Sequence, residues 1–180
     1  GGNMSIFTGS AVALCTPFDE SGVNYETLGR LIDFQLENGT DALVVCGTTG
    51  EPSTMTEEEK LGAIEYAVKK AAGKVPVIAG TGGNDTREVV HMSKAAQGLG
   101  ADALLVVTPY YNKCSPDGLK KHFFAVADAV SIPIVIYNVP ARTGFNVTPA
   151  MLVSLAAHPN IAAIKEASAN IAQIVEMARL

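Results

Sequence analysis

The sequence of 180 residues is poor in cysteine and histidine, and both shortages exclude kinds of site. Its three cysteines, Cys15, Cys46 and Cys114, are an odd number and lie far apart, which argues against a disulfide framework. They are expected to be reduced, buried thiols of a cytoplasmic protein, although Cys114 lies in a polar loop. The three histidines show no metal-ligand spacing, so no metal is expected.

Long apolar runs, basic runs and nucleotide-binding motifs are also missing. No stretch approaches about 20 uninterrupted apolar residues, and the N-terminus has no signal pattern, so neither a membrane partner nor export is expected. A net charge of −5 without a basic run gives no reason to expect nucleic acid. "GTGGN" at residues 80–84 does not match the G-x-G-x-x-G fingerprint, and no Walker pattern is present, so no cofactor is expected.

What the sequence does contain is a series of short apolar runs separated by helical patterns. The runs are rich in β-branched residues and too continuous for half-exposed strands, which is typical of a parallel sheet covered on both faces. Between them lie helix-start signals, such as Thr56 with Glu59, Ser115 with Pro116, and Thr148 with Pro149. The six runs begin at Ala11, Asp41, Val75, Asp102, Ile132 and Ile161.

The alternation of strands and helices predicts one α/β domain over residues 4–180. Residues 1–3, "GGN", are expected to be left over from expression and to lie outside the fold. The unit repeats, since "GTDALVVCGTTG" at 39–50 resembles "GADALLVVTPYY" at 100–111. A repeating βα unit builds either a doubly wound open sheet or a (β/α)8 barrel. Length mildly favours the open sheet, because a barrel usually needs about 250 residues.

Polar side chains gather after the predicted strands, where parallel α/β folds bind their ligands. A lysine at a dry strand end can act as a nucleophile, and its natural electrophile is a ketone, which gives a Schiff base. An arginine can grip a carboxylate, and tyrosine and threonine hydroxyls can relay protons. A 2-keto acid would use all of these groups. The residues are Thr48, Thr49, Tyr110, Tyr111, Tyr137, Asn138, Arg142 and Lys165.

Each of these residues also has a plainer interpretation. A strand-end lysine is more often a solvated rim residue or half of an ion pair, and Glu166 points the opposite way along the strand, so it is not an obvious partner. Arg142 alone is more often a surface residue of a loop. The tyrosine pair could serve packing or an interface. The convergence of several polar loops on one face favours a site over these separate explanations.

Four motifs together are specific for one family. "GTTGE" at 47–51, "TPYYNK" at 108–113, "YNVPARTG" at 137–144 and "IKEAS" at 164–168, in this order and spacing, closely resemble the dihydrodipicolinate synthase family. The resemblance runs from Met4 onward. It implies the (β/α)8 barrel of the pyruvate-dependent class I aldolases, of which this chain would supply about six βα units. Two further units follow in the family, so the resemblance implies an incomplete barrel, truncated or a piece of a longer protein.

The resemblance also implies a reaction and the roles of single residues. Pyruvate condenses with aspartate semialdehyde through a Schiff base on a lysine, which begins the diaminopimelate and lysine pathway. Lys165 resembles the Schiff-base lysine, and Tyr137, Thr49 and Tyr111 resemble the proton relay, the last donated across a dimer interface. Thr48 and Thr49 resemble the pyruvate-carboxylate site, and Arg142 the group that binds the aldehyde substrate's carboxylate. A homo-oligomer, dimer or tetramer, follows from the same resemblance.

Two alternative functions stay open at this stage. One is another pyruvate-dependent aldolase, of the keto-deoxy-sugar-acid or N-acetylneuraminate lyase type. Arg142 in "RTG" argues for the synthase, because the sialic acid lyases bind a longer, polyhydroxylated substrate. The other alternative is a non-catalytic, incomplete barrel that only oligomerises.

Feedback inhibition by lysine gives a first testable prediction. The resemblance implies a lysine site near the helix that begins "TEEEK", which here carries Glu57 and Lys60. The ammonium of Lys60 would repel that of a bound lysine. We therefore expect weak or absent binding in a calorimetric titration with lysine, and tight binding would contradict the prediction.

Overall fold

The computed structural model describes residues 5–180. Residues 1–4 lie outside the described residues. Two expectations concern these residues: that residues 1–3 are left over from expression, and that the domain begins at Met4. The chain forms two compact units. Unit 1 comprises the chain up to Gly80 with Ala95–Leu104, and unit 2 comprises Thr81–Lys94 with Leu105–Leu180.

The six predicted strands are present and form one sheet. Their order along the sheet is their order along the chain, and the pairings β1–β4, β4–β5 and β7–β8 are parallel. A barrel needs this order, whereas a doubly wound sheet reverses its order at a switch point. The barrel-type α/β fold is therefore confirmed, and the open sheet that length favoured was wrong. The strands are β1 (Ala11–Ala13), β4 (Ala42–Val45), β5 (Val77–Gly80), β6 (Ala103–Val107), β7 (Ile134–Asn138) and β8 (Ile161–Glu166).

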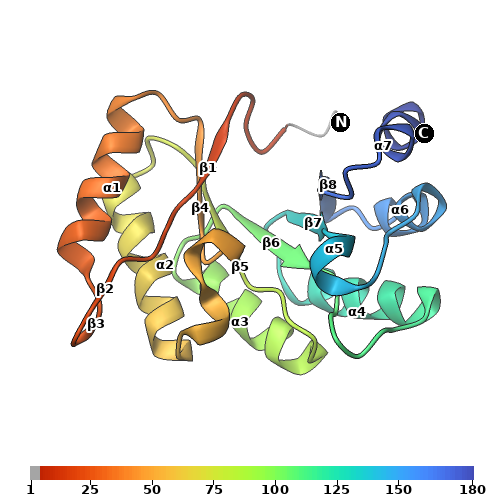
Figure 1. Cartoon of the computed structure of the whole chain (residues 1–180), viewed down its shortest axis with the longest axis horizontal. Coiled ribbons are helices and arrows are strands. Elements are labelled where there is room, and N and C mark those ends of the chain that lie inside the picture. Colours follow the sequence, from red (N-terminus) through yellow and green to blue (C-terminus); the bar gives the residue numbers. More distant parts are fainter. Residues whose placement is uncertain (1–4) are drawn as a thin grey trace. The chain divides into compact units, whose positions relative to one another are not determined.

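Unit 1 is built on β1, β4 and β5. Its helices are α1 (Tyr25–Glu37) and α2 (Glu57–Ala71), which pack side by side, and α2 also contacts β4 and β5 (Figure 1). The predicted capping box of α2 is present, since the Thr56 N–H donates to Glu59 Oε2 at 2.8 Å and the Glu59 N–H donates to Thr56 Oγ1 at 3.2 Å. Two short strands were not predicted from the sequence, β2 (Phe18–Asp19) and β3 (Gly22–Val23), which pair as an antiparallel hairpin.

Unit 2 contains the end of β6, the whole of β7 and β8, and the helices that follow these strands. Within it α6 contacts both α4 and α7, and it also contacts β8 (Figure 1). The predicted caps Ser115 and Thr148 accept from the N–H groups of Gly118 and Met151, which fixes the first turns of α4 and α6. The helices are α4 (Pro116–Ala129), α5 (Pro140–Thr143), α6 (Pro149–Ala156) and α7 (Ile171–Arg179), and α3 (Thr86–Gly98) contributes to both units.

Each unit has an apolar core of aliphatic residues from its strands and helices. Burying such side chains contributes about 1.5–3 kcal/mol each before conformational entropy is counted. In the part of the chain that the structure describes, no helix has the length and apolar character needed to cross a bilayer. Fully buried residues include Ile32, Leu43, Ile64 and Val77 in unit 1 and Leu119, Phe123, Ile134, Ile136 and Leu155 in unit 2.

Gly80, the last residue of β5, lies against the turn that ends β4. A Cβ atom at Gly80 would overlap the backbone carbonyl of Cys46 and lie 3.0 Å from the nitrogen of Gly47. The obstacle is backbone rather than the flexible end of a side chain, so it cannot move aside cheaply. Glycine at this position therefore allows the close approach of two strands just before Thr48 and Thr49.

The Gly80→Ala substitution should destabilise the protein. Overpacking of a tight site typically costs about 1–3 kcal/mol, and urea unfolding followed by circular dichroism measures the loss. Gly98→Ala is the matched control, because an added Cβ at Gly98, in α3, meets no atom within 4 Å. Equal unfolding midpoints for the two variants would contradict the packing argument.

Candidate active site

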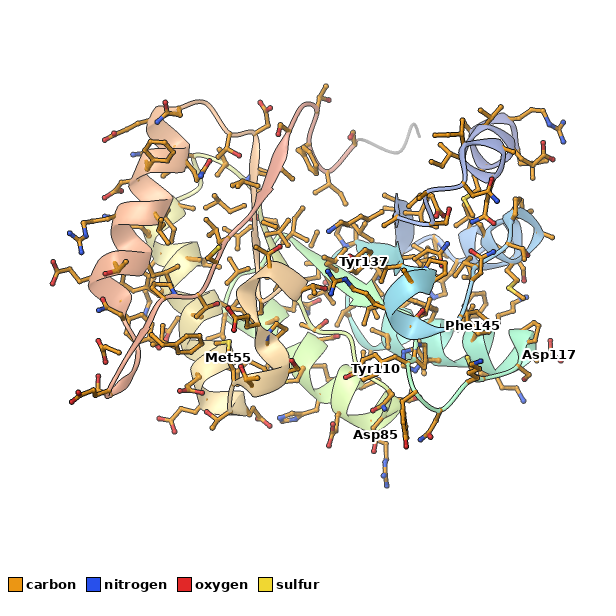
Figure 2. All side chains as sticks on the ribbon, in the orientation of Figure 1. Met55, Asp85, Tyr110, Asp117, Tyr137 and Phe145 are labelled. Atoms are coloured by element: carbon orange, nitrogen blue, oxygen red, sulfur yellow. The ribbon has the colours of Figure 1, made fainter. Side chains whose placement is uncertain are left out.

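The structure brings Lys165 and Tyr137 together at the carboxyl ends of two neighbouring strands. Tyr137 of β7 is paired in register with Lys165 of β8, so their side chains share one face of the sheet. The Nζ atom of Lys165 lies 4.3 Å from the centroid of the Tyr137 ring. Tyr137 lies at the end of β7 (Figure 2) and is 7% exposed. An ammonium at this distance is attracted by the electron-rich ring face, so the ring favours this position of Nζ.

The dry environment predicted for Lys165 is not found in the described chain. Lys165 is exposed, as are Ala162 and Ala163 of the same strand. In the described sheet β8 follows β7 at the end of the strand order, so one side of β8 has no strand beside it. Activation of this lysine by burial therefore stays a prediction. In the described residues, the contact that Lys165 makes is with the ring of Tyr137.

The other face of the same two strands carries an amide and a carboxylate. Asn138 is paired in register with Glu166, one position beyond the Tyr137–Lys165 pair. Asn138 Nδ2 donates to Glu166 Oε1 at 3.1 Å and to Oε2 at 2.9 Å. The prediction that Glu166 points away from Lys165 is confirmed. The carboxylate instead binds an asparagine that is 0% exposed.

Two further amides extend this contact into the neighbouring loop and helix. Asn146 Oδ1 accepts from Asn138 Nδ2 at 3.1 Å, and Asn146 Nδ2 donates to Gln173 Oε1 at 2.8 Å. Gln173 Nε2 donates back to Asn146 Oδ1 at 3.0 Å. No motif or spacing in the sequence singles out Asn146 or Gln173. The only available signal was the alternation of side chains in β7 and β8, which sends Asn138 and Glu166 to a common face.

Arg142 is exposed in the last turn of the short helix α5, directly after β7. The helix ends at Gly144, whose φ of 69° lies in the left-handed region that favours glycine. The Thr143 hydroxyl donates to the Phe145 carbonyl at 2.9 Å and accepts from the Phe145 N–H at 3.1 Å. The turn next to Arg142 is therefore fixed by local hydrogen bonds, while the guanidinium faces solvent. Figure 2 labels Phe145 at this turn.

Tyr110 and Tyr111 lie in the loop after β6. Tyr111 is 88% exposed and has a φ of 65°, which is unusual for a residue with a side chain. The backbone around it is restrained, because the Tyr110 carbonyl accepts from the Asn112 N–H at 2.8 Å and from Asn84 Nδ2 at 3.2 Å. Figure 2 labels Tyr110 in this loop. The loop thus presents the Tyr111 ring to solvent rather than to the core of its own unit.

Thr48 and Thr49 lie in unit 1, in the turn η1 (Thr48–Gly50) directly after β4, and both are exposed. The turn is tied to the end of β1, since the Thr16 hydroxyl donates to the Gly50 carbonyl at 2.7 Å. Their position at a strand end is as predicted. Their closeness to Lys165 and Tyr137, which lie in unit 2, stays a prediction.

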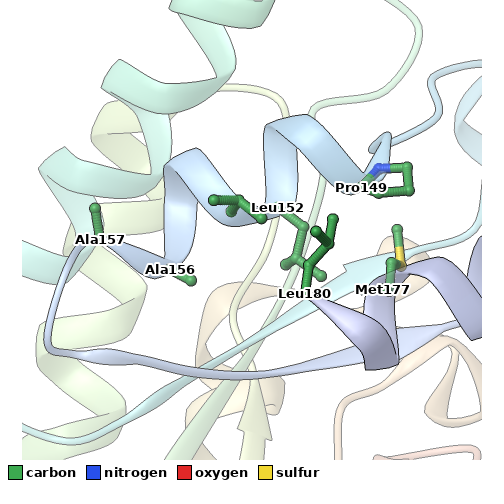
Figure 3. Close-up of a pocket in the computed structure, with 7 residues that line it drawn as sticks. Pro149, Leu152, Ala156, Ala157, Met177 and Leu180 are labelled. Atoms are coloured by element: carbon green, nitrogen blue, oxygen red, sulfur yellow. The ribbon is translucent and has the colours of Figure 1, made fainter.

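A groove between α6 and α7 has a volume of about 310 Å³ (Figure 3). Its lining contains no charged side chain, so it does not suit a keto acid. Among residues 5–180 no group of three or more histidine, cysteine, aspartate or glutamate side chains could hold a metal ion. The lining residues of the groove are Pro149, Leu152, Val153, Ala156, Ala157, Met177 and Leu180.

The three cysteines are free, and they differ in exposure. Cys46 is buried as expected, and burial raises the pKa of its thiol to about 12. Cys15 is exposed, so the expectation that it is buried was wrong. It follows the short strand β1 rather than lying inside it. Cys114 is half-buried, and burial raises its pKa. A thiol with a raised pKa is a weak nucleophile near neutral pH.

The fold and the site together define a class of protein. It is a parallel βα protein of the barrel type that carries a lysine paired with a tyrosine at its strand ends. A model of the dihydrodipicolinate synthetase family matches residues 6–180. The chain belongs to this family.

Known proteins of the family resemble the chain closely. The 4-hydroxy-tetrahydrodipicolinate synthase of Caldicellulosiruptor bescii is 60% identical over 178 residues, which cover 98% of this chain and 60% of that protein. The crystal structure of dihydrodipicolinate synthase from Aquifex aeolicus has a TM-score of 0.93 at 53% identity, covering 95% of this chain and 59% of that one. The crystal structure of dihydrodipicolinate synthase from Thermotoga maritima has a TM-score of 0.95 at 42% identity, covering 98% of this chain and 60% of that one. The chain thus spans about 60% of the length of the curated relatives it matches.

The thiol environments predict an order of reaction with iodoacetamide. In the folded protein at pH 8, Cys15 should be alkylated first and Cys114 more slowly. Cys46 should remain unmodified, because with a pKa of about 12 only about one thiol in ten thousand is ionised. Peptide mass spectrometry measures each site, and all three should react in urea. Rapid alkylation of Cys46 in the folded protein would contradict its burial.

Proposed function

We propose that this chain carries the imine-forming chemistry of a 4-hydroxy-tetrahydrodipicolinate synthase, which condenses pyruvate with aspartate semialdehyde. The observation that carries the proposal is the 4.3 Å contact between Lys165 Nζ and the Tyr137 ring at adjacent strand ends. An amine beside a phenol supplies both a nucleophile and a proton carrier, which imine formation requires. Membership of the dihydrodipicolinate synthetase family supports the choice of substrates.

The first step joins Lys165 to pyruvate. The neutral amine Nζ adds to the ketone carbon C2, which forms a C–N bond and leaves a carbinolamine. Protonation of its hydroxyl releases one water, and the nitrogen lone pair forms the C=N bond of the imine. We propose that Tyr137 carries the proton that the departing hydroxyl needs. Thr49 and Tyr111 would connect its phenol to solvent.

The imine then acts as an electron sink for carbon–carbon bond formation. Loss of a proton from C3 gives the enamine, and C3 attacks the aldehyde carbon of aspartate semialdehyde, whose oxygen takes up a proton. The α-amine of that substrate next attacks C2 of the imine. This attack closes the ring and releases the Lys165 amine, so the enzyme is regenerated and 4-hydroxy-tetrahydrodipicolinate is formed.

The remaining residues are proposed to bind the two carboxylates. Thr48 and Thr49 would donate hydrogen bonds to the carboxylate of pyruvate from the turn after β4. Arg142 would bind the carboxylate of aspartate semialdehyde, and its exposure in the last turn of α5 leaves the guanidinium accessible for such a bidentate contact. No metal or organic cofactor takes part in these steps.

Tyr111 is proposed to serve the site of a second copy of the chain. Its ring is 88% exposed on a backbone with a φ of 65°, so the loop directs it away from its own unit. A tyrosine presented in this way suits an interface, because its ring packs while its hydroxyl stays available. The protein would accordingly act as a homo-oligomer, a dimer or tetramer, in the cytoplasm.

Borohydride reduction in the presence of pyruvate tests the proposed function. The reduced adduct should increase the mass of the chain by that of pyruvic acid less one oxygen atom, and peptide mapping should place it on Lys165. Lys165→Ala should abolish the adduct with little effect on folding, because the side chain is exposed.

Lys121→Ala is the matched control, since Lys121 is an exposed lysine of α4 in the same unit. It should leave the adduct unchanged. With the adduct in place, aspartate semialdehyde compared with sugar aldehydes identifies the second substrate. Absence of any adduct, or equal labelling of the Lys165→Ala variant, would contradict the proposal.

A further inference from the structure

The pair Asn138–Glu166 follows the reacting pair Tyr137–Lys165 by one residue on each strand. In the β7–β8 ladder Tyr137 faces Lys165 and the next rung joins Asn138 to Glu166. Successive side chains of a strand point to opposite faces, so the two pairs lie back to back across the same stretch of backbone. A displacement of the backbone at Asn138 or Glu166 therefore displaces the Cα atom of the adjacent reacting residue.

Both polar groups of the Asn138 side chain are engaged, as is its backbone carbonyl. Its Nδ2 donates to Glu166 and, at 3.1 Å, to Asn146 Oδ1. Its Oδ1 accepts from the Val147 N–H at 3.0 Å, and its backbone carbonyl accepts from the Ala167 N–H at 2.8 Å. A side chain that is 0% exposed and satisfied in this way has one orientation available to it.

Glu166 connects the end of β8 to the segment that follows. Its Oε1 accepts from the Ser168 N–H at 2.8 Å, and its Oε2 lies 3.5 Å from Nε2 of Gln173, in the first turn of α7. Gln173 is itself bonded to Asn146. The carboxylate thus ties together the ends of β7 and β8 and α7, and Asn146 joins the loop before α6 to them through Asn138 and Gln173.

The ladder itself does not fix the register of the two strands without interruption. The pairing of β7 with β8 shifts between Ile134 and Val135, where Ile134 faces Ile161 but Val135 faces Ala163. A slip by one residue would send every side chain of β8 to the opposite face, and Lys165 with them. A side-chain contact at the carboxyl end of the ladder, such as Asn138–Glu166, would therefore help the backbone hydrogen bonds to hold the register.

We propose that Asn138 and Glu166 are positioning residues that hold Lys165 Nζ over the Tyr137 ring by fixing the register and twist of β7 and β8 from the opposite face of the sheet. The proposal rests on the proposed function, since it assigns a purpose to the same lysine. Neither residue touches the reacting atoms. Their contribution acts through the strand backbone.

Three variants separate positioning from simple stabilisation. Asn138→Asp replaces the donor by a carboxylate and sets two carboxylates in direct contact. The double variant Asn138→Asp with Glu166→Gln restores a donor–acceptor pair with its polarity reversed and the total charge unchanged. Asn160→Asp is the matched control: Asn160 Nδ2 donates to the carbonyls of Val130 at 2.7 Å and Ala127 at 3.3 Å, just before the amino end of β8.

Two measurements read the position of Lys165 independently of each other. The first is the rate of borohydride trapping with pyruvate, well below the melting temperature of each variant. The second uses no pyruvate: reductive 13C-methylation labels the lysines, and NMR records the methyl resonance of Lys165, assigned with Lys165→Ala. Methyl groups over the face of Tyr137 are shifted upfield by its ring current, so the resonance reports the contact directly.

Asn138→Asp should slow trapping about tenfold or more, because small displacements of a reacting group have effects of that size. The same variant should move the Lys165 methyl resonance toward those of the other exposed lysines. The double variant should recover most of both signals. Asn160→Asp should lower the melting temperature and leave both signals as they are. If Asn138→Asp does not fold, Glu166→Gln alone should change both signals in the same direction by less.

Several results would overturn the proposal. They are an unshifted Lys165 resonance in the unaltered protein, a loss of stability in Asn138→Asp with both signals unchanged, or no recovery in the double variant. If the unaltered protein traps no pyruvate, the proposed function fails. The methyl resonances still decide whether Asn138 and Glu166 position Lys165.

Discussion

The parallel register of β7 and β8 is the constraint on which the rest of the candidate site depends. It sets Tyr137 opposite Lys165 and, one residue later, Asn138 opposite Glu166. Since side chains alternate between faces, four residues on two strands provide the Tyr137–Lys165 pair on one face and the Asn138–Glu166 pair, a polar clamp, on the other. The contact of 4.3 Å on one face and the 2.9 Å hydrogen bond on the other are consequences of a single backbone arrangement.

In unit 1 close backbone packing, rather than a side-chain clamp, sets the end of a strand. Gly80 lets β5 approach the backbone of Cys46 and Gly47, where β4 ends and the turn with Thr48 and Thr49 begins. Cys46 has a φ of 56°, so the chain bends sharply as it leaves the strand. In both units the polar residues of the candidate site follow the strand ends. Gly80 packs closely beside the end of β4, and the buried Asn138 binds Glu166 at the end of β8.

The fold was largely predictable, because its signals are local. Continuous apolar runs marked the six strands, and Thr56, Ser115 and Thr148 marked helix starts that the structure confirms. The hairpin β2–β3 was missed because strands of two residues have no pattern to recognise. The surroundings of Lys165 were not predictable from its strand alone. An apolar run shows that a strand suits a sheet, but the covering of its last residue depends on elements elsewhere in the chain.

The clamp around Asn138 was harder to predict than the Tyr137–Lys165 pair, because its members are far apart in sequence and ordinary in type. Asn146 lies in a loop and Gln173 in a helix, where polar residues usually face solvent. Their role arises only when tertiary packing brings them to Glu166. The same physics explains why such residues matter. Asn138 and Gln173 are buried, so a lost partner would leave either of them desolvated, and the contact tolerates little rearrangement. A network of that kind transmits a fixed geometry through two strands, so residues that never meet the substrate can determine how closely an amine and a phenol are held together.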